Sequence, residues 1–107
     1  MVTVDYYPRE YRFQARGHAG SGDPGRDLVC AGVSALVLTL RENLLGMERR
    51  GELRLRVLAA ELGAAQFWCE PLPGHEGEAE RLFDTVVTGL ELLQRLFGDC
   101  VRVSCHG

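Results

Sequence analysis

Residues 27–46 read DLVCAGVSALVLTLRENLLG, and their hydrophobic pattern determines the expected architecture of the chain. Asp27 is a favoured N-cap residue and Gly46 a favoured stop, so we predict a helix between them. The helix is apolar around much of its circumference, which indicates deep burial or a second contact surface such as a dimer partner. The apolar residues at helical spacing are Val29, Val33, Leu36, Val37, Leu40 and Leu44.

Two strand-like segments precede this helix. Residues 2–7 and 11–17 alternate between apolar and polar, and residues 8–10 join them, so we predict a β-hairpin. The following residues, 17–26, hold four glycines and a proline, which predicts a loop. The hairpin and the helix are therefore expected to be linked by an irregular, glycine-rich connection.

The second half of the chain repeats the pattern of two strands and a helix. In residues 52–58 the alternation predicts that Leu53, Leu55 and Val57 face the core. Residues 64–70 form a second short strand, and residues 59–63 between the two fit a helical turn or a hairpin connection equally well.

An apolar stripe then predicts a helix from Glu78 to Gly98, and residues 99–105 alternate as a final strand. The element order is therefore ββαββαβ. We predict an α+β fold, a two-layer α/β sandwich in which a mainly antiparallel sheet carries both helices on one face. With 107 residues, the chain is expected to form a single domain, residues 1–107.

Charge and hydropathy restrict the function classes. The net charge of −3 argues against direct nucleic-acid binding, which favours a basic face. The longest uncharged run, residues 28–40, is shorter than the roughly 20 apolar residues of a membrane span. The N-terminus lacks the pattern of a signal peptide. We therefore expect a cytoplasmic protein without a membrane partner, whose four cysteines are reduced.

Cys30 and His18 are the candidate reactive pair. If Asp27 is the N-cap, Cys30 lies in the first helical turn, where unpaired backbone N–H groups favour a thiolate and the Asp27 carboxylate opposes it by like-charge repulsion. His18 continues the polar side of its strand, and Gly17 makes it easy to redirect the ring toward the helix. Ser34 lies one turn after Cys30 on the same face. A buried structural cysteine and a solvated histidine are nevertheless the commoner interpretation of these residue types.

The motif around this pair is similar to a known family signature. Residues 17–19 (GHA), the glycine loop and residues 27–34 (DLVCAGVS) resemble the signature of the ribosomal-processing cysteine protease family, Prp. The resemblance implies Cys30 as nucleophile and His18 as general base. It implies supporting roles for two further residues, Asp27 and Ser34.

The same resemblance implies a substrate and partners. The family removes the N-terminal extension of large-subunit ribosomal protein twenty-seven during ribosome assembly, so this extension is the expected peptide partner. A homodimer is also implied. The loop that would cover the substrate peptide includes Gly17, Ala19, Gly20, Gly22 and Gly25.

No metal site and no cofactor are expected. The spacing of Cys100, Cys105 and His106 fits no common structural zinc pattern. The alternative to a peptidase is a catalytically silent dimeric module that binds a ribosomal protein or an assembly factor. The reactivity of Cys30, compared with that of the other cysteines, distinguishes the two.

Overall fold

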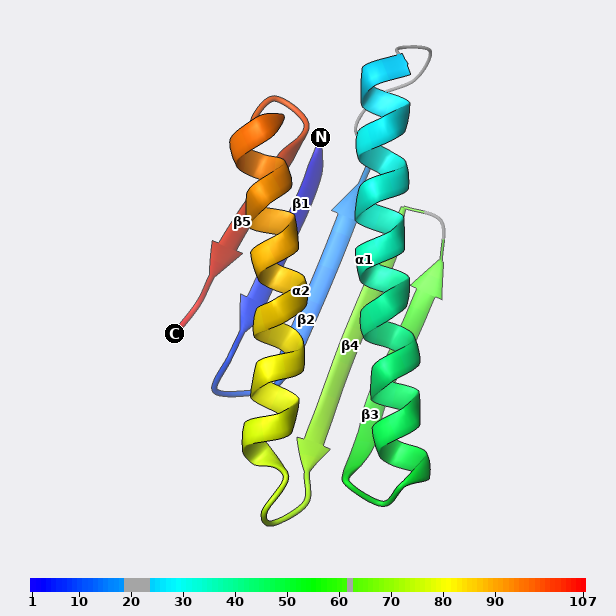
Figure 1. The fold of residues 1–107 in the computed structure, drawn as a ribbon, viewed down its shortest axis with the longest axis vertical. Coiled ribbons are helices and arrows are strands. Elements are labelled where there is room, and N and C mark those ends of the chain that lie inside the picture. The colour runs from blue at the N-terminus through cyan, green and yellow to red at the C-terminus, as the bar shows by residue number, and fades with distance from the viewer. Residues whose placement is uncertain (19–23, 62) are drawn as a thin grey trace.

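The computed structural model describes residues 1–18, 24–61 and 63–107, with the backbone alone for residues 24–27. The predicted order ββαββαβ is confirmed (Figure 1). The elements are β1 (Val2–Tyr7), β2 (Arg12–Gly17), α1 (Pro24–Arg49), β3 (Leu53–Glu61), β4 (Ala64–Pro71), α2 (Glu76–Leu96) and β5 (Val101–Cys105).

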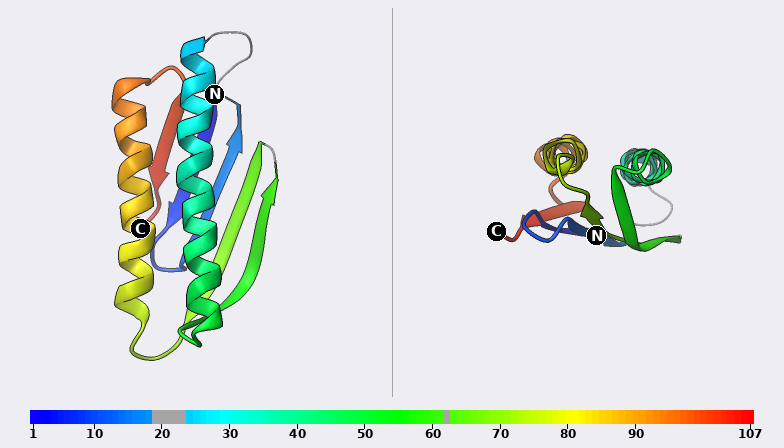
Figure 2. Two further views of the ribbon diagram at one scale, coloured as in Figure 1. Left: turned by 45° about the vertical axis from the view of Figure 1, so that its right-hand side comes forward. Right: turned by 90° about the horizontal axis from the view of Figure 1, so that it is seen from below.

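The five strands form one mixed sheet in the order β3-β4-β2-β1-β5. β1 and β5 are parallel, and the other three neighbouring pairs are antiparallel. Both helices lie on the same face of this sheet (Figure 2). The predicted α+β sandwich with a mainly antiparallel sheet is therefore confirmed.

The hydrophobic core lies between the sheet and the two helices. Phe13 of β2 and Phe67 of β4 are both fully buried, and their rings stack with centroids 5.9 Å apart. Offset stacking of this kind stabilises the pair beyond the burial of its area. From the helices, α1 contributes Leu40 and Leu44, and α2 contributes Phe83 and Leu90, all at 0 % exposure.

The start of α1 differs from the prediction. The helix begins at Pro24, three residues before the predicted N-cap, Asp27. Proline is favoured at the first helical position, because the N–H it lacks has no partner within the helix. Cys30 therefore lies in the second turn, and its predicted place in the first turn is wrong. The helix dipole acts mainly within the first turn, so it gives Cys30 less support than the sequence indicated.

The end of α1 also differs from the prediction. The helix continues through Gly46, the predicted stop, as far as Arg49. A glycine inside a helix costs about 1 kcal/mol relative to alanine. Leu44 and Met47, which flank Gly46, are 0 % and 4 % exposed. Their burial outweighs the cost of the glycine.

The outer face of α1 remains accessible. By length and composition, residues Leu28–Arg49 resemble a membrane span, but one such helix is weak evidence, because core helices of soluble proteins meet the same criterion. One side of α1 packs against α2 and β3, whereas Leu28 and Leu38 are 67 % and 51 % exposed. Deep burial on all sides is therefore wrong, and a second contact surface is the remaining alternative.

A β-bulge changes the expected facing of β3. Leu55 pairs with Cys69 of β4, whereas Val57 pairs with the next residue, Trp68, so Arg56 is the extra residue. After this bulge the side-chain alternation is reversed. Leu55 and Leu58 pack against the core, and the prediction that Val57 faces it together with Leu55 is wrong. The ambiguous residues 59–63 belong to a hairpin, because β3 continues to Glu61 and pairs with β4.

Candidate functional site

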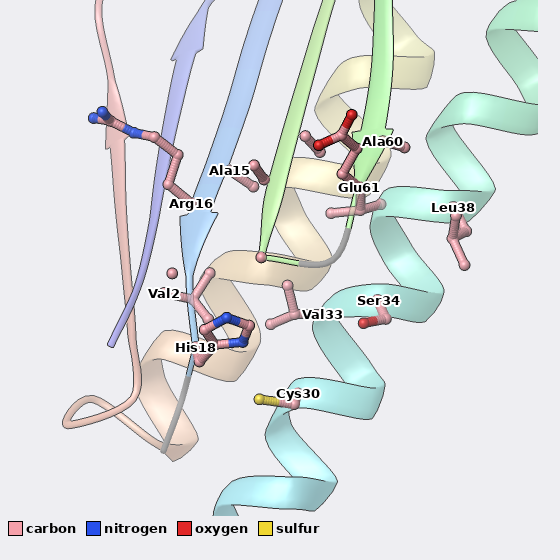
Figure 3. A pocket seen from close by; sticks show the side chains of 15 residues that line it. Val2, Ala15, Arg16, His18, Cys30, Val33, Ser34, Leu38, Ala60 and Glu61 are labelled. Atoms are coloured by element: carbon pink, nitrogen blue, oxygen red, sulfur yellow. The ribbon is translucent and has the colours of Figure 1, made fainter. Parts of the chain in front are cut away.

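His18 and Cys30 line one cavity of about 280 Å³. Its walls come from the end of β2, the first half of α1 and the β3–β4 hairpin (Figure 3). The two residues are twelve positions apart in the sequence, and the chain between them passes from the sheet layer to the helix layer. The fold thus places an imidazole and a thiol at the same opening.

Backbone geometry at the end of β2 directs His18 toward this cavity. Gly17 has a φ of +99°, a left-handed conformation that suits glycine. A Cβ atom at this position would overlap the Met1 carbonyl oxygen, so close packing also requires glycine. β1 and β2 pair in regular register as far as Val2 and Gly17. The predicted redirection of His18 is therefore achieved by the strand end rather than by a bulge.

Cys30 approaches the cavity from α1. Its side chain is half-buried beside Val29 and Val33, which are 1 % and 7 % exposed. Figure 3 shows its Sγ atom pointing toward the side of the cavity where the His18 ring lies. Ser34, one turn further along α1, lines the same cavity. The structure thus brings together three of the four residues to which the resemblance gives a role in catalysis.

The other predicted site residues have different outcomes. Gly17, predicted to belong to the substrate-binding loop, lines the cavity. Gly25 was expected in that loop but belongs to the first turn of α1, because the helix starts early. Ala19, Gly20 and Gly22 lie outside the described residues, and so does the side chain of Asp27.

One wall of the cavity, the β3–β4 hairpin, was not expected from the sequence. Ala60, Glu61, Gly63 and Ala64 line the cavity from this hairpin. No local pattern assigns these residues to a site whose His18 and Cys30 are 30 or more positions away in the sequence. The remaining lining is largely apolar, from Val2, Ala15, Val33, Val37, Leu38 and Ala65. An apolar cavity open to solvent suits the side chain of a bound peptide.

The other cysteines are in less reactive surroundings. Cys69 is 1 % exposed, and burial, with a smaller effect from the Glu70 carboxylate, raises the pKa of its thiol to about 12. The pKa of Cys105 is also raised, first by burial and then by Glu91 and Asp84. Cys100 is 7 % exposed. Because the thiolate is the nucleophilic form of cysteine, burial of Cys69 and Cys100 disfavours attack by them, and the raised pKa of the exposed Cys105 lowers its thiolate fraction.

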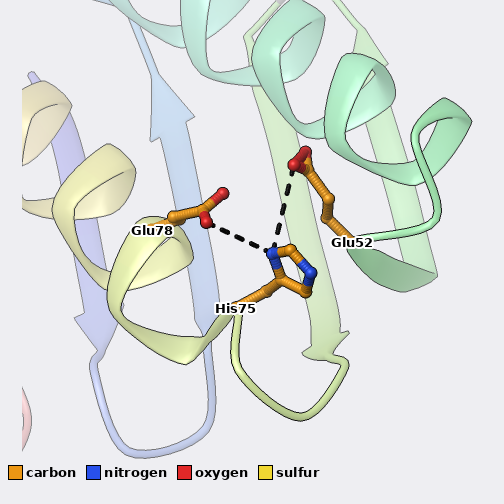
Figure 4. Close-up of side chains that lie close together, drawn as sticks. All are labelled: Glu52, His75 and Glu78. Carbon is orange, nitrogen blue, oxygen red and sulfur yellow. Dashed lines mark hydrogen bonds and ion pairs between the residues drawn. The ribbon is translucent and has the colours of Figure 1, made fainter.

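A second group of polar side chains lies at the opposite end of the sheet (Figure 4). His75 Nδ1 is 3.2 Å from Glu78 Oε1 and 4.0 Å from Glu52 Oε2. Glu52 also accepts a hydrogen bond of 2.7 Å from Arg50 Nε. Within the described part of the chain, these three ligand-type side chains are the one group that lies close enough together to hold a metal ion. The contacts of His75 with the two carboxylates connect the residue before β3 to the first turn of α2.

Comparison with known proteins identifies relatives of the chain. Residues 1–102 match the model of a family described as cysteine protease Prp. The structure of the ribosomal processing protease Prp from S. aureus with a substrate peptide superposes with a TM-score of 0.73 and 22 % identity, covering 99 % of this chain and 100 % of that one. The same protease with a covalently linked product peptide gives a TM-score of 0.75 and 23 % identity, with the same coverage.

A third solved structure shares the fold. SMU.848 from Streptococcus mutans superposes with a TM-score of 0.67 and 21 % identity, over 97 % of this chain and 90 % of that one. No curated protein sequence matches the chain.

Proposed function

The chain belongs to the cysteine protease Prp family, and from this premise we propose that it is a cysteine endopeptidase with Cys30 as nucleophile and His18 as general base. The observation that carries the proposal is that these two side chains, from α1 and from the end of β2, line one open cavity. The proposed substrate is the N-terminal extension of large-subunit ribosomal protein twenty-seven, removed in the cytoplasm during ribosome assembly.

The proposed reaction has two stages. His18 takes the proton of the Cys30 thiol, and the thiolate attacks the carbonyl carbon of the scissile peptide bond. The C–N bond then breaks, the imidazolium protonates the leaving amine, and the acyl group remains on sulfur as a thioester. In the second stage His18 takes a proton from water, which attacks the thioester, and Cys30 leaves with that proton. Asp27 and Ser34 have supporting roles in this scheme.

Two further observations support peptide cleavage. The cavity is apolar and open, so an extended peptide can place one side chain in it while its backbone passes Cys30. The S. aureus protease with the same fold has been crystallised with a substrate peptide and with a covalently linked product peptide. In our proposal the loop from Gly17 to α1 covers the bound peptide, with Ala19, Gly20 and Gly22 in its middle.

Mass spectrometry of peptide cleavage tests the proposal. A synthetic peptide with the extended N-terminus of the ribosomal protein from the same organism is incubated with the wild type, Cys30→Ala and Cys69→Ala. We expect a cut with the wild type and Cys69→Ala and none with Cys30→Ala. Cleavage by Cys30→Ala would exclude Cys30 as nucleophile. The absence of a cut with all three folded proteins would count against this substrate.

The alternative is a catalytically silent dimeric module that binds a ribosomal protein or an assembly factor. The exposed Leu28 on α1, which does not line the cavity, favours this alternative, because an apolar residue on an outer helix face suits a protein partner. We also propose the homodimer for the peptidase, on the same observation. Light scattering of the wild type and Leu28→Glu tests dimer formation, because Leu28 is exposed and does not line the cavity. Cleavage by a monomeric Leu28→Glu variant would show that activity does not depend on the dimer.

A further inference from the structure

The turn between β3 and β4 lies directly against the ring of His18. Gly63 in this turn has a φ of +80°, and a Cβ atom there would lie 2.6 Å from His18 Nε2 and 2.8 Å from Cε1. Real Cβ atoms essentially never come this close to another heavy atom. The imidazole can therefore occupy its observed place only while residue 63 has no side chain.

A backbone hydrogen bond fixes the same turn to the strand that carries His18. The N–H of Gly17 donates to the Gly63 carbonyl oxygen at 2.9 Å. The turn is therefore bonded to the residue before His18 and is packed against the His18 ring. These two contacts come from one glycine, and both act on the position of the imidazole relative to Cys30.

We propose that Gly63 is a positioning residue, which holds the His18 imidazole at the cavity opposite Cys30 by offering backbone without a side chain. This inference rests on the proposed function, because it assumes that His18 activates Cys30. A methyl group at position 63 would push the ring off its present place. A general base works only within hydrogen-bond reach of the proton it removes, so a small displacement of the ring lowers the reactivity of Cys30.

The chain offers a matched control for the backbone. Gly51 has a φ of +74°, close to that of Gly63, but a Cβ atom there meets nothing within 4 Å. Alanine at either position adopts an unfavourable left-handed conformation. Only alanine at position 63 also meets the imidazole. The difference between Gly63→Ala and Gly51→Ala therefore isolates the contact with His18 from backbone strain.

The experiment measures the rate of Cys30 alkylation by iodoacetamide from pH 5 to pH 9 in the wild type, Gly63→Ala, Gly51→Ala and His18→Ala. We expect Gly63→Ala to react about 10-fold more slowly near pH 7, with a pH profile shifted toward that of His18→Ala. Gly51→Ala should keep the wild-type profile. Adding Gly63→Ala to His18→Ala should cause no further slowing, because the ring is already absent.

A second pair of variants keeps the test valid if Gly63→Ala does not fold. Asparagine tolerates left-handed backbone better than alanine but still has a Cβ atom. Gly63→Asn should therefore slow alkylation while Gly51→Asn does not. Equal rates in these two folded variants would overturn the proposal.

The same measurements separate this inference from the proposed function. If His18→Ala slows alkylation but the Gly63 variants react like the wild type, Gly63 is not a positioning residue and the proposed pair stands. If His18→Ala itself leaves the rate unchanged, the pairing of His18 with Cys30 is wrong, and the role of Gly63 falls with it.

Discussion

The two ends of the sheet each have a histidine and a cysteine, but they arrange them differently. At one end, which we call the cavity end, His18 and Cys30 line a common opening of about 280 Å³. At the other, which we call the capped end, Cys69 is 1 % exposed in the core, and His75 lies beside the carboxylates of Glu52, before β3, and Glu78, in α2. The same two residue types are thus accessible together at the cavity end and separately engaged at the capped end.

This difference shows that the same two residue types can lie in very different surroundings within one fold. Burial of Cys69 raises its pKa to about 12, so the protonated thiol is the dominant form at neutral pH. His75 already has carboxylate partners and is part of the connection between β3 and α2. The cavity end differs because its strand end and its helix both open toward solvent, where a substrate can reach them.

The largest expected effect is on the rate of peptide cleavage, and it should distinguish the two histidines. His18→Ala should lower the rate of peptide cleavage by about 10²–10⁴-fold, the usual contribution of a general base. His75→Ala should leave the rate within about twofold of the wild type, because it lies at the far end of the sheet. Steady-state kinetics with circular dichroism to verify folding checks both variants. An equal loss in the two would remove the functional distinction between the ends.

The second expected effect is a difference in the alkylation rates of Cys30 and Cys69. With a pKa of about 12, roughly one Cys69 side chain in 10⁵ is a thiolate at pH 7. We expect iodoacetamide to label Cys30 more than about 100-fold faster than Cys69 in the native protein. Peptide mapping after timed labelling measures both rates. Labelling of Cys69 at the rate of Cys30 would mean that the core opens readily or that Cys30 is not activated.

The buried thiol also predicts a dependence of stability on alkaline pH. Because the folded state raises the pKa of Cys69 from 9.0 to about 12, its contribution is complete below pH 9 and is lost as the pH rises toward 12. The loss approaches about 1.4 kcal/mol per pH unit in that window. Urea unfolding at several pH values should show a steeper fall for the wild type than for Cys69→Ala. Identical slopes would indicate that Cys69 ionises as readily in the folded state as in the unfolded state.

The smallest effect is expected from the exposed ion pair of the capped end. Glu78→Gln removes the negative charge from the 3.2 Å contact with His75, but the Glu78 side chain is 56 % exposed. Exposed pairs of this kind contribute about 0.2–1 kcal/mol, so the free energy of unfolding should fall by no more than that. Cleavage should not change. Chemical denaturation gives the first value, and a loss of activity in Glu78→Gln would show that the two ends are coupled.

Much of the fold follows from the hydrophobic pattern. All seven elements were predicted in the right order, because each has a clear period of two or of three to four residues. The errors occur where tertiary contacts override local preference. Gly46 does not end α1, because Leu44 and Met47 on either side of it are buried. The bulge at Arg56 was missed because the sequence of β3 alternates regularly between apolar and polar residues up to Val57.

The candidate site was predictable only in its local part. His18, Cys30 and Ser34 belong to one short segment with a specific motif, and they do line one cavity. The role that we propose for Gly63 was not predictable, because it depends on contact with a ring 45 positions away in the sequence. A positive φ and the absence of a Cβ atom at that glycine become meaningful only when the neighbouring side chain is known.

The extra residue in β3 has a consequence for comparing related sequences. Ala60 pairs with Ala65 of β4 and lines the cavity because Arg56 has reversed the alternation before it. A relative with an unbulged hairpin would have one residue fewer between its counterparts of Leu55 and Ala60. An alignment of the two without a gap would equate a cavity residue with one on the outer face. A one-residue gap at position 56 would restore the correspondence.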